Sequence, residues 1–226
     1  MDKEELNNKF LILLNFKTYK ESLGENGKKL MQAIAENKEL AEQKNTIVFA
    51  CPQFVDLRDF SKIDEHILAQ GASNFEAGAH TGSNNIEALK SAGVKGILIN
   101  HSENQIPIEK IKHLICGCKD AQLVSVVCVD TPEKAEQIAE FTPDYIAIEP
   151  PELIGSGISL TEANPEIVTN TLNKIENIPI LCGAGVSNAE HVKKAKELGV
   201  KGVLVASAFV KNKDSDKWVK DVLNIL

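Results

Sequence analysis

The stretch Tyr145-Ile-Ala-Ile-Glu149, continued by Pro150-Pro-Glu-Leu-Ile-Gly-Ser-Gly157, places a carboxylate at the end of a short apolar run and before a proline pair. Prolines hold their own φ and restrict the preceding residue, whereas the two glycines accept dihedral angles closed to other residues. A strand that ends in a fixed carboxylate beside a hinged loop suggests catalysis. An ion-paired Glu in an ordinary surface turn would produce the same pattern. Other residues along the chain are needed to distinguish a catalytic carboxylate from such an ion pair.

Similar apolar runs recur along the whole chain and alternate with longer amphipathic segments. The predicted strands are Phe10–Leu14, Thr46–Ala50, Ile67–Gln70, Gly96–Ile99, Leu123–Val129, Tyr145–Ile148, Ile180–Cys182 and Gly202–Val205. The predicted helices are Gly24–Gln43, Val55–Phe60, Ile86–Ala92, Pro107–Ala121, Pro132–Glu140, Pro165–Ile175, Ala189–Leu198 and Ser215–Leu226. Runs that are continuously apolar, each returning through a helix, predict a parallel sheet covered on its outer face.

Eight such units predict closure into a (β/α)8 barrel, an α/β fold with an eight-stranded parallel sheet, formed as one domain over residues 1–226. An open doubly wound sheet is the alternative. It usually has fewer strands and a Gly-rich fingerprint after the first one, and Asn15-Phe-Lys-Thr18 is no such fingerprint.

Helix boundaries are marked by familiar residues. Thr131-Pro132-Glu133 and Asn164-Pro165-Glu166 place a capping residue, a proline and a carboxylate in the order that a helix start prefers. Gly93 and Gly199 stand where helices are expected to end.

Composition limits the possible partners. A net charge of −7 argues against nucleic acid or an anionic membrane. The acidic start Met1–Glu5 lacks the layout of a signal peptide, and no apolar run approaches the roughly 20 residues of a membrane span, so we expect a cytoplasmic protein. Five cysteines fit reduced thiols, and Cys116-Gly-Cys118 is too closely spaced for a usual zinc site, so we expect no metal and no organic cofactor.

The chain has a single arginine, Arg58. Without a choice of guanidinium groups for a bidentate clamp, a phosphorylated ligand would have to rely on backbone N–H groups, helix N-termini and a lysine.

Polar and small residues follow five of the predicted strands, at the end of a barrel where active sites lie. They are Asn15 and Lys17, Asn100 to Glu103, Glu149, Gly183 to Gly185, and Ala206 to Ala208. Each has an ordinary structural explanation by itself. Together, a carboxylate, a histidine, a lysine and two turns that suit a phosphate are the groups needed to move a proton α to a carbonyl in a small phosphorylated sugar.

These motifs also resemble one family in order and spacing. Asn15-Phe-Lys17, Asn100-His-Ser-Glu103, Glu149 to Gly157, Cys182-Gly-Ala-Gly185 and Val205-Ala-Ser207 are similar to those of the triosephosphate isomerases, and the short length resembles the archaeal-type branch. The resemblance runs from about Lys9 to the C-terminus and implies the TIM barrel. It also implies interconversion of dihydroxyacetone phosphate and D-glyceraldehyde 3-phosphate through an enediolate.

The resemblance further implies residue roles. Glu149 would be the catalytic base and His101 the neutral electrophile, while Lys17 would add positive charge beside the substrate and Asn15 would hydrogen-bond it. The remaining residues implied to bind substrate, mainly through backbone amides at the phosphate, are Phe16, Ile154, Gly155, Gly185, Ala206 and Ser207.

His80-Thr-Gly-Ser83 resembles the family's subunit-interface loop, which implies a homo-oligomer, either a dimer or a tetramer. Two positions depart from the family pattern. Asn104-Gln105 stands where two arginines are common, and Ala208 stands where glycine is expected. Without the two arginines a supporting ion pair near the loop after Glu149 is missing, so these departures bear on the catalytic rate more than on the resemblance itself.

Two rival readings stay open at this point. Another phosphosugar barrel enzyme, an epimerase or a lyase, would want metal-binding His and Asp at strand ends or a Schiff-base lysine within a strand, and neither is seen. A non-catalytic oligomer could keep the barrel without the chemistry, because fold does not guarantee function.

Overall fold

The computed structural model describes residues 6–153 and 159–226. Eight parallel strands form one sheet in the order β2-β1-β8-β7-β6-β5-β4-β3. Their bounds are β1 Phe10–Asn15, β2 Thr46–Cys51, β3 Leu68–Ala69, β4 Gly96–Ile99, β5 Val124–Val129, β6 Tyr145–Ile148, β7 Ile180–Cys182 and β8 Gly202–Val205. A parallel bridge between Ala50 and Ile67 joins the two edges, and the Ala50 N–H donates to the His66 carbonyl at 2.9 Å. The predicted barrel is confirmed.

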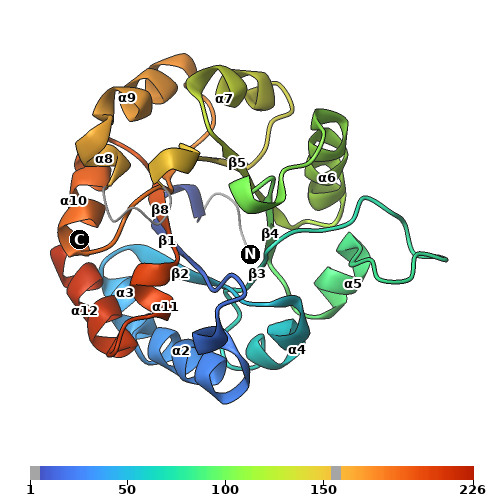
Figure 1. The fold of residues 1–226 in the computed structure, drawn as a ribbon, viewed down its shortest axis with the longest axis horizontal. Coiled ribbons are helices and arrows are strands. Elements are labelled where there is room, and N and C mark those ends of the chain that lie inside the picture. Colours follow the sequence, from blue (N-terminus) through green and yellow to red (C-terminus); the bar gives the residue numbers. More distant parts are fainter. Residues whose placement is uncertain (1–5, 154–158) are drawn as a thin grey trace.

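Helices surround the strands in a ring (Figure 1). The α-helices are α2 Gly24–Glu36, α3 Lys38–Gln43, α4 Leu57–Phe60, α5 Ile86–Ser91, α6 Ile108–Asp120, α7 Pro132–Ala139, α8 Leu160–Ala163, α9 Pro165–Lys174, α10 Ala189–Glu197, α11 Ser207–Val210 and α12 Ser215–Ile225. Short 3-10 turns η1 to η4 lie at Lys20–Ser22, Phe54–Asp56, Ser102–Asn104 and Pro151–Leu153. Within the described residues no helix combines the length and apolarity needed to cross a bilayer.

The strands are apolar on both sides because one side faces the inside of the barrel and the other side faces the surrounding helices. Leu11, Leu13 and Phe49 belong to a cluster that fills the inside of the barrel. Ile12 and Leu14, which alternate with them, belong to the cluster that also contains the helix side chains. This double burial explains why the strands read as unbroken apolar runs.

The predicted helix over 24–43 is wrong in one respect, because it is interrupted at Asn37. That residue has φ −101° and ψ 9°, and it separates α2 from α3. Its side-chain amide donates to the Ala33 carbonyl and to Asp216 Oδ1 in α12, each at 2.8 Å. A contact with the last helix therefore stabilises the break.

Other local predictions are confirmed with small changes, except that Asn164 precedes α9 without making a side-chain capping hydrogen bond. Thr131 Oγ1 accepts from the Lys134 N–H at 3.2 Å and caps α7. Gly93 and Gly199 have φ of 93° and 95°, the left-handed values expected at helix ends. Strand β3 is shorter than predicted, and the helix α8 was not predicted.

Candidate active site

Seven of the ten predicted site residues lie at the carboxyl ends of the strands, around a cavity of about 480 Å³. Its wall contains Asn15, Lys17, His101, Glu149, Gly185, Ala206 and Ser207. These side chains and turns follow β1, β4, β6, β7 and β8, whose carboxyl ends lie on the same rim of the parallel barrel. Barrel closure therefore brings the predicted groups together.

Glu149 follows the last residue of β6, and its backbone N–H donates to the Val129 carbonyl at 2.8 Å. The sheet thus fixes the position of its Cα. Its side chain is buried, and among the described residues Glu149 Oε2 has no hydrogen-bond partner. Burial raises the pKa of this carboxyl, while His101, the Cys128 thiol and Lys17 act in the opposite direction. A raised carboxyl pKa favours proton abstraction near neutral pH.

His101 follows β4, and its Nδ1 accepts a hydrogen bond from the Glu103 backbone N–H at 3.2 Å. A nitrogen that accepts from an amide carries a lone pair, so in the neutral imidazole the proton is assigned to Nε2. His101 Nε2 lies 3.8 Å from Glu149 Oε2, which is too long for a direct hydrogen bond. The His101 N–H donor and the Glu149 carboxylate therefore face each other without a direct hydrogen bond, and both stay available to a ligand.

Lys17 has φ 47°, a left-handed value that is uncommon for a residue with a side chain. The turn is held from two directions, since the Lys17 N–H donates to Asn15 Oδ1 and Gln70 Nε2 donates to the Lys17 carbonyl, each at 3.0 Å. At the other end of the side chain, Lys17 Nζ lies 2.6 Å from Glu103 Oε1. Strained backbone of this kind concentrates at functional sites.

The far end of the cavity is built from two small-residue turns. Gly185 has φ 71°, which suits glycine. Ala206 precedes α11, whose first internal hydrogen bond runs from the Phe209 N–H to the Ala206 carbonyl. The amides of Ser207 and Ala208 open this helical turn beside the cavity, an arrangement that suits an anion.

Three predicted site residues are not placed on the cavity wall. Phe16 is fully buried, and its ring packs on Phe209 with centroids 6.0 Å apart. Its side chain is therefore core, and it anchors the turn between Asn15 and Lys17. Ile154 and Gly155 lie outside the described residues.

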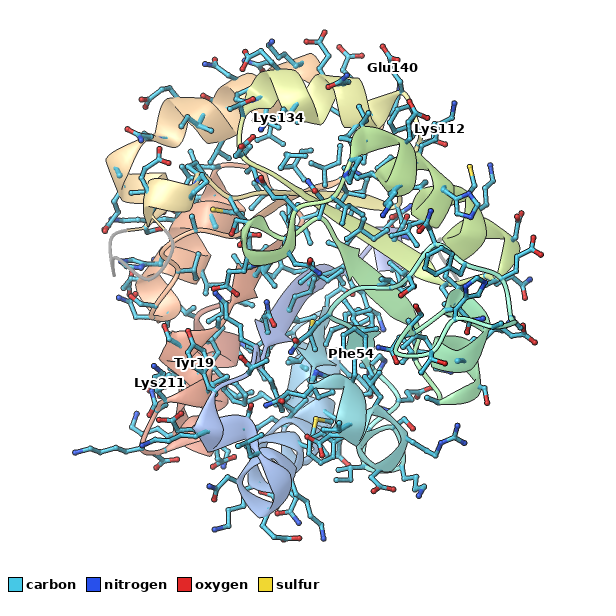
Figure 2. The ribbon with its side chains drawn as sticks, turned by 45° about the vertical axis from the view of Figure 1, so that its right-hand side comes forward. Tyr19, Phe54, Lys112, Lys134, Glu140 and Lys211 are labelled. Atoms are coloured by element: carbon cyan, nitrogen blue, oxygen red, sulfur yellow. The ribbon has the colours of Figure 1, made fainter. Side chains whose placement is uncertain are left out.

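Sequence reasoning gave no role to a pair at the cavity rim, Tyr19 and Lys211. Lys211 Nζ lies 4.2 Å above the Tyr19 ring, and Figure 2 shows the two residues side by side. Lys211 is four residues after Ser207, so helical spacing places them on one face. That spacing could have identified Lys211 as a residue at the cavity rim.

The described part of the chain contains no group of three or more His, Cys, Asp or Glu residues arranged to hold a metal ion. Its five cysteines are free thiols, and only Cys116 is exposed. Burial raises the pKa of Cys182 to about 12, with the nearby Glu149 carboxylate as a smaller cause. This thiol is therefore protonated beside the site.

A closed parallel barrel with a buried carboxylate, an imidazole and a lysine at its carboxyl end defines a (β/α)8-barrel enzyme. The family model described as triosephosphate isomerase matches residues 10–224. The chain belongs to the triosephosphate isomerase family.

Curated relatives agree over nearly the full length. The triosephosphate isomerase of Methanothermus fervidus is 40% identical over 218 residues, 94% of this chain and 97% of the relative. That of Methanocaldococcus jannaschii is 40% identical over 221 residues, 96% of this chain and 100% of the relative. That of Sulfurisphaera tokodaii is 37% identical over 220 residues, 96% of this chain and 95% of the relative.

Proposed function

We propose that this chain interconverts dihydroxyacetone phosphate and D-glyceraldehyde 3-phosphate, with Glu149 as the base and His101 as the electrophile. The observation that carries the proposal is the buried Glu149 carboxylate facing the His101 imidazole at 3.8 Å, on the wall of a cavity that ends in two small-residue turns. The relatives' names support the choice of a triose phosphate.

The reaction follows from these positions. Glu149 takes a proton from the carbon next to the carbonyl, and the electrons of the broken C–H bond move onto the carbonyl oxygen to form an enediolate. The His101 Nε2–H donates a hydrogen bond to that oxygen. The proton of the hydroxyl group on the first carbon moves to the former carbonyl oxygen, which leaves the negative charge on the hydroxyl oxygen. That oxygen becomes the new carbonyl as protonated Glu149 returns its proton to the carbon that carried the old carbonyl, so no atom or electron is gained or lost overall.

Lys17 and Asn15 support this step in different ways. The Lys17 ammonium offsets the negative charge of the substrate and of the enediolate, and the site residue Asn15 fixes the lysine turn through its side-chain oxygen. The phosphate is bound by backbone amides at Gly185, Ala206 and Ser207. Ile154 and Gly155 stay predicted phosphate contacts, and the mechanism requires no metal or organic cofactor.

We further infer a homo-oligomer. Phe75 is 45% exposed and stacks on His80 with ring centroids 4.4 Å apart, in the loop between β3 and α5 that extends from the barrel in Figure 1. Leu23, Phe54 and Val55 are further large apolar side chains left exposed. Light scattering on a size-exclusion column should give a mass of at least two chains, and Phe75→Asp should reduce it. A monomer at micromolar concentration would contradict this inference.

The activity is tested by a coupled assay on the purified protein in both directions. Glu149→Gln removes the base with little change of shape and should lower kcat by about 10²- to 10⁴-fold. Glu152→Gln is the matched control, because it changes an exposed Glu three residues away and should leave kcat unchanged. Wild-type turnover no faster than that of Glu149→Gln would reject the proposed function, and turnover of a pentose phosphate instead would favour the epimerase alternative.

A further inference from the structure

A buried histidine on α10 contacts two separate segments at the phosphate end of the cavity. His191 Nδ1 lies 3.3 Å from the backbone nitrogen of Ser187 and 3.2 Å from its Oγ, in the turn after β7. His191 Nε2 lies 3.2 Å from Glu162 Oε2 in α8. One imidazole therefore bridges the turn after β7 and the helix α8.

The hydrogen bonds assign a role to each ring nitrogen. The Ser187 N–H donates to Nδ1, so Nδ1 carries the lone pair and the proton of the neutral ring is on Nε2. The Nε2–H then points at the Glu162 carboxylate. Lys194 Nζ holds the other carboxylate oxygen at 2.6 Å, and this hydrogen bond is the largest cause of the lowered pKa of Glu162. Glu162 is therefore an ionised acceptor that orients the ring.

The turn that His191 contacts is part of the cavity wall. Ser187 lines the cavity, two residues after Gly185. The Trp218 indole N–H from α12 donates to the Ser187 carbonyl at 3.2 Å, so the N–H and the C=O of this residue are both held. The Leu160 N–H donates to the Ala184 carbonyl at 3.1 Å, which makes a second link between α8 and the same turn.

We propose that His191 is a positioning residue that holds the Gly185–Ser187 turn in the geometry that binds a phosphate group, with Glu162 orienting its ring. The inference rests on the proposed function for the identity of the substrate, but its ligand chemistry is that of any phosphate monoester or of inorganic phosphate. Backbone amides bind an anion well only when their positions and directions are held closely to the binding geometry. A residue such as His191, which holds the turn without touching the anion, therefore affects the affinity for phosphate.

Two amide variants separate the two halves of the bridge. Asn places its Oδ1 near the position of Nδ1, so His191→Asn keeps the acceptor for the Ser187 N–H and loses the donor to Glu162. Gln places its amide nitrogen near the position of Nε2, so His191→Gln keeps the donor and loses the acceptor. Glu190→Gln, an exposed change on the same helical turn, is the matched control.

Titration calorimetry with inorganic phosphate measures the binding without turnover. His191→Gln should raise the phosphate Kd by about five- to tenfold, the value of one lost hydrogen bond. His191→Asn should raise it about two- to threefold, and Glu190→Gln should leave it unchanged. In the coupled assay His191→Gln should raise KM by a similar factor while kcat stays within about twofold.

The outcomes separate this inference from the proposed function. Loss of phosphate affinity in His191→Gln supports the inference even where the wild type turns over no triose phosphate. An unchanged Kd, equal losses in both amide variants, or no phosphate binding by the wild type would overturn it. Where His191→Gln does not fold, Glu162→Ala carries the test, because Glu162 is partly exposed and its loss should still raise the Kd above that of Glu190→Gln.

Discussion

The Glu149 carboxylate packs directly on the backbone of Gly183, so closely that a Cβ on Gly183 would overlap the Glu149 Cγ and lie 2.6 Å from its Cδ. Gly183 has no left-handed φ that would require glycine. Glycine is therefore required at position 183 because a larger residue would collide with the Glu149 side chain. The position of the Glu149 carboxylate thus depends on the turn after β7.

Gly183→Ala should lower kcat by about 10²-fold, because a shift of about 1 Å in a catalytic group costs that much. The coupled assay measures the loss. Gly71→Ala is the matched control, since an added Cβ there meets nothing closer than 3.8 Å. Wild-type kcat in Gly183→Ala would show that the Glu149 position does not depend on this contact.

The raised pKa of Glu149 predicts that Glu149→Gln is more stable than the wild type at neutral pH. Between its unfolded and folded pKa values the folded state binds more protons than the unfolded state, so this group makes stability fall as pH rises. Above the folded pKa a charged carboxylate stays buried at a cost that Gln avoids.

Urea midpoints at pH 7 and below about pH 4 measure this effect, at one protein concentration because the chain is proposed to be an oligomer. The higher midpoint of Glu149→Gln should be present at pH 7 and should disappear in acid, where the carboxyl is protonated in both states. A wild type as stable as the variant at pH 7 would argue against a raised pKa.

The left-handed backbone of Lys17 predicts a difference between two variants that both lack the amine. Lys17→Gly should be more stable than Lys17→Ala by up to about 1 kcal/mol, because glycine adopts φ 47° without strain. Urea unfolding measures the difference, and both variants should lose activity equally. Greater stability of the Ala variant would contradict the strained turn.

The small-residue turn before α11 predicts a charge effect on ligand binding. Ala206→Asp should weaken binding of inorganic phosphate, because a like charge is placed on the cavity wall. Ala206→Asn has nearly the same shape without the charge, so it should weaken binding less, and titration calorimetry compares the two. Equal affinities in both variants and the wild type would reject the assignment of this turn to the phosphate.

The strands and their closure into a parallel barrel could be predicted, because the strands are apolar on both sides, as Ile12 and Leu13 show, and each returns through a helix. The break at Asn37 could not, because it depends on Asp216, which is far away in sequence. Some helix starts could also be predicted from their capping residues, and Thr131 caps α7 as its sequence indicates.

In the candidate site, too, the features that depend on local sequence could be predicted and those that depend on distant contacts could not. Glu149, His101 and Lys17 could be proposed from the sequence because each stands one or two residues after a predicted strand, and the structure places all three on one cavity wall. The burial of the Phe16 side chain could not be predicted, because its neighbours on both sides line the cavity. The contacts of His191 depend on three elements packing together, and nothing in its own helix marks them.

The central claim is that Glu149 moves the proton, and isomerisation in D2O tests it most directly. A base that exchanges with solvent should place deuterium at C-2 of D-glyceraldehyde 3-phosphate formed from dihydroxyacetone phosphate, which proton NMR detects. The wild type and Glu152→Gln should both incorporate deuterium at C-2, and Glu149→Gln should neither isomerise nor exchange at a comparable rate. Deuterium incorporation by Glu149→Gln at the wild-type rate would contradict the account.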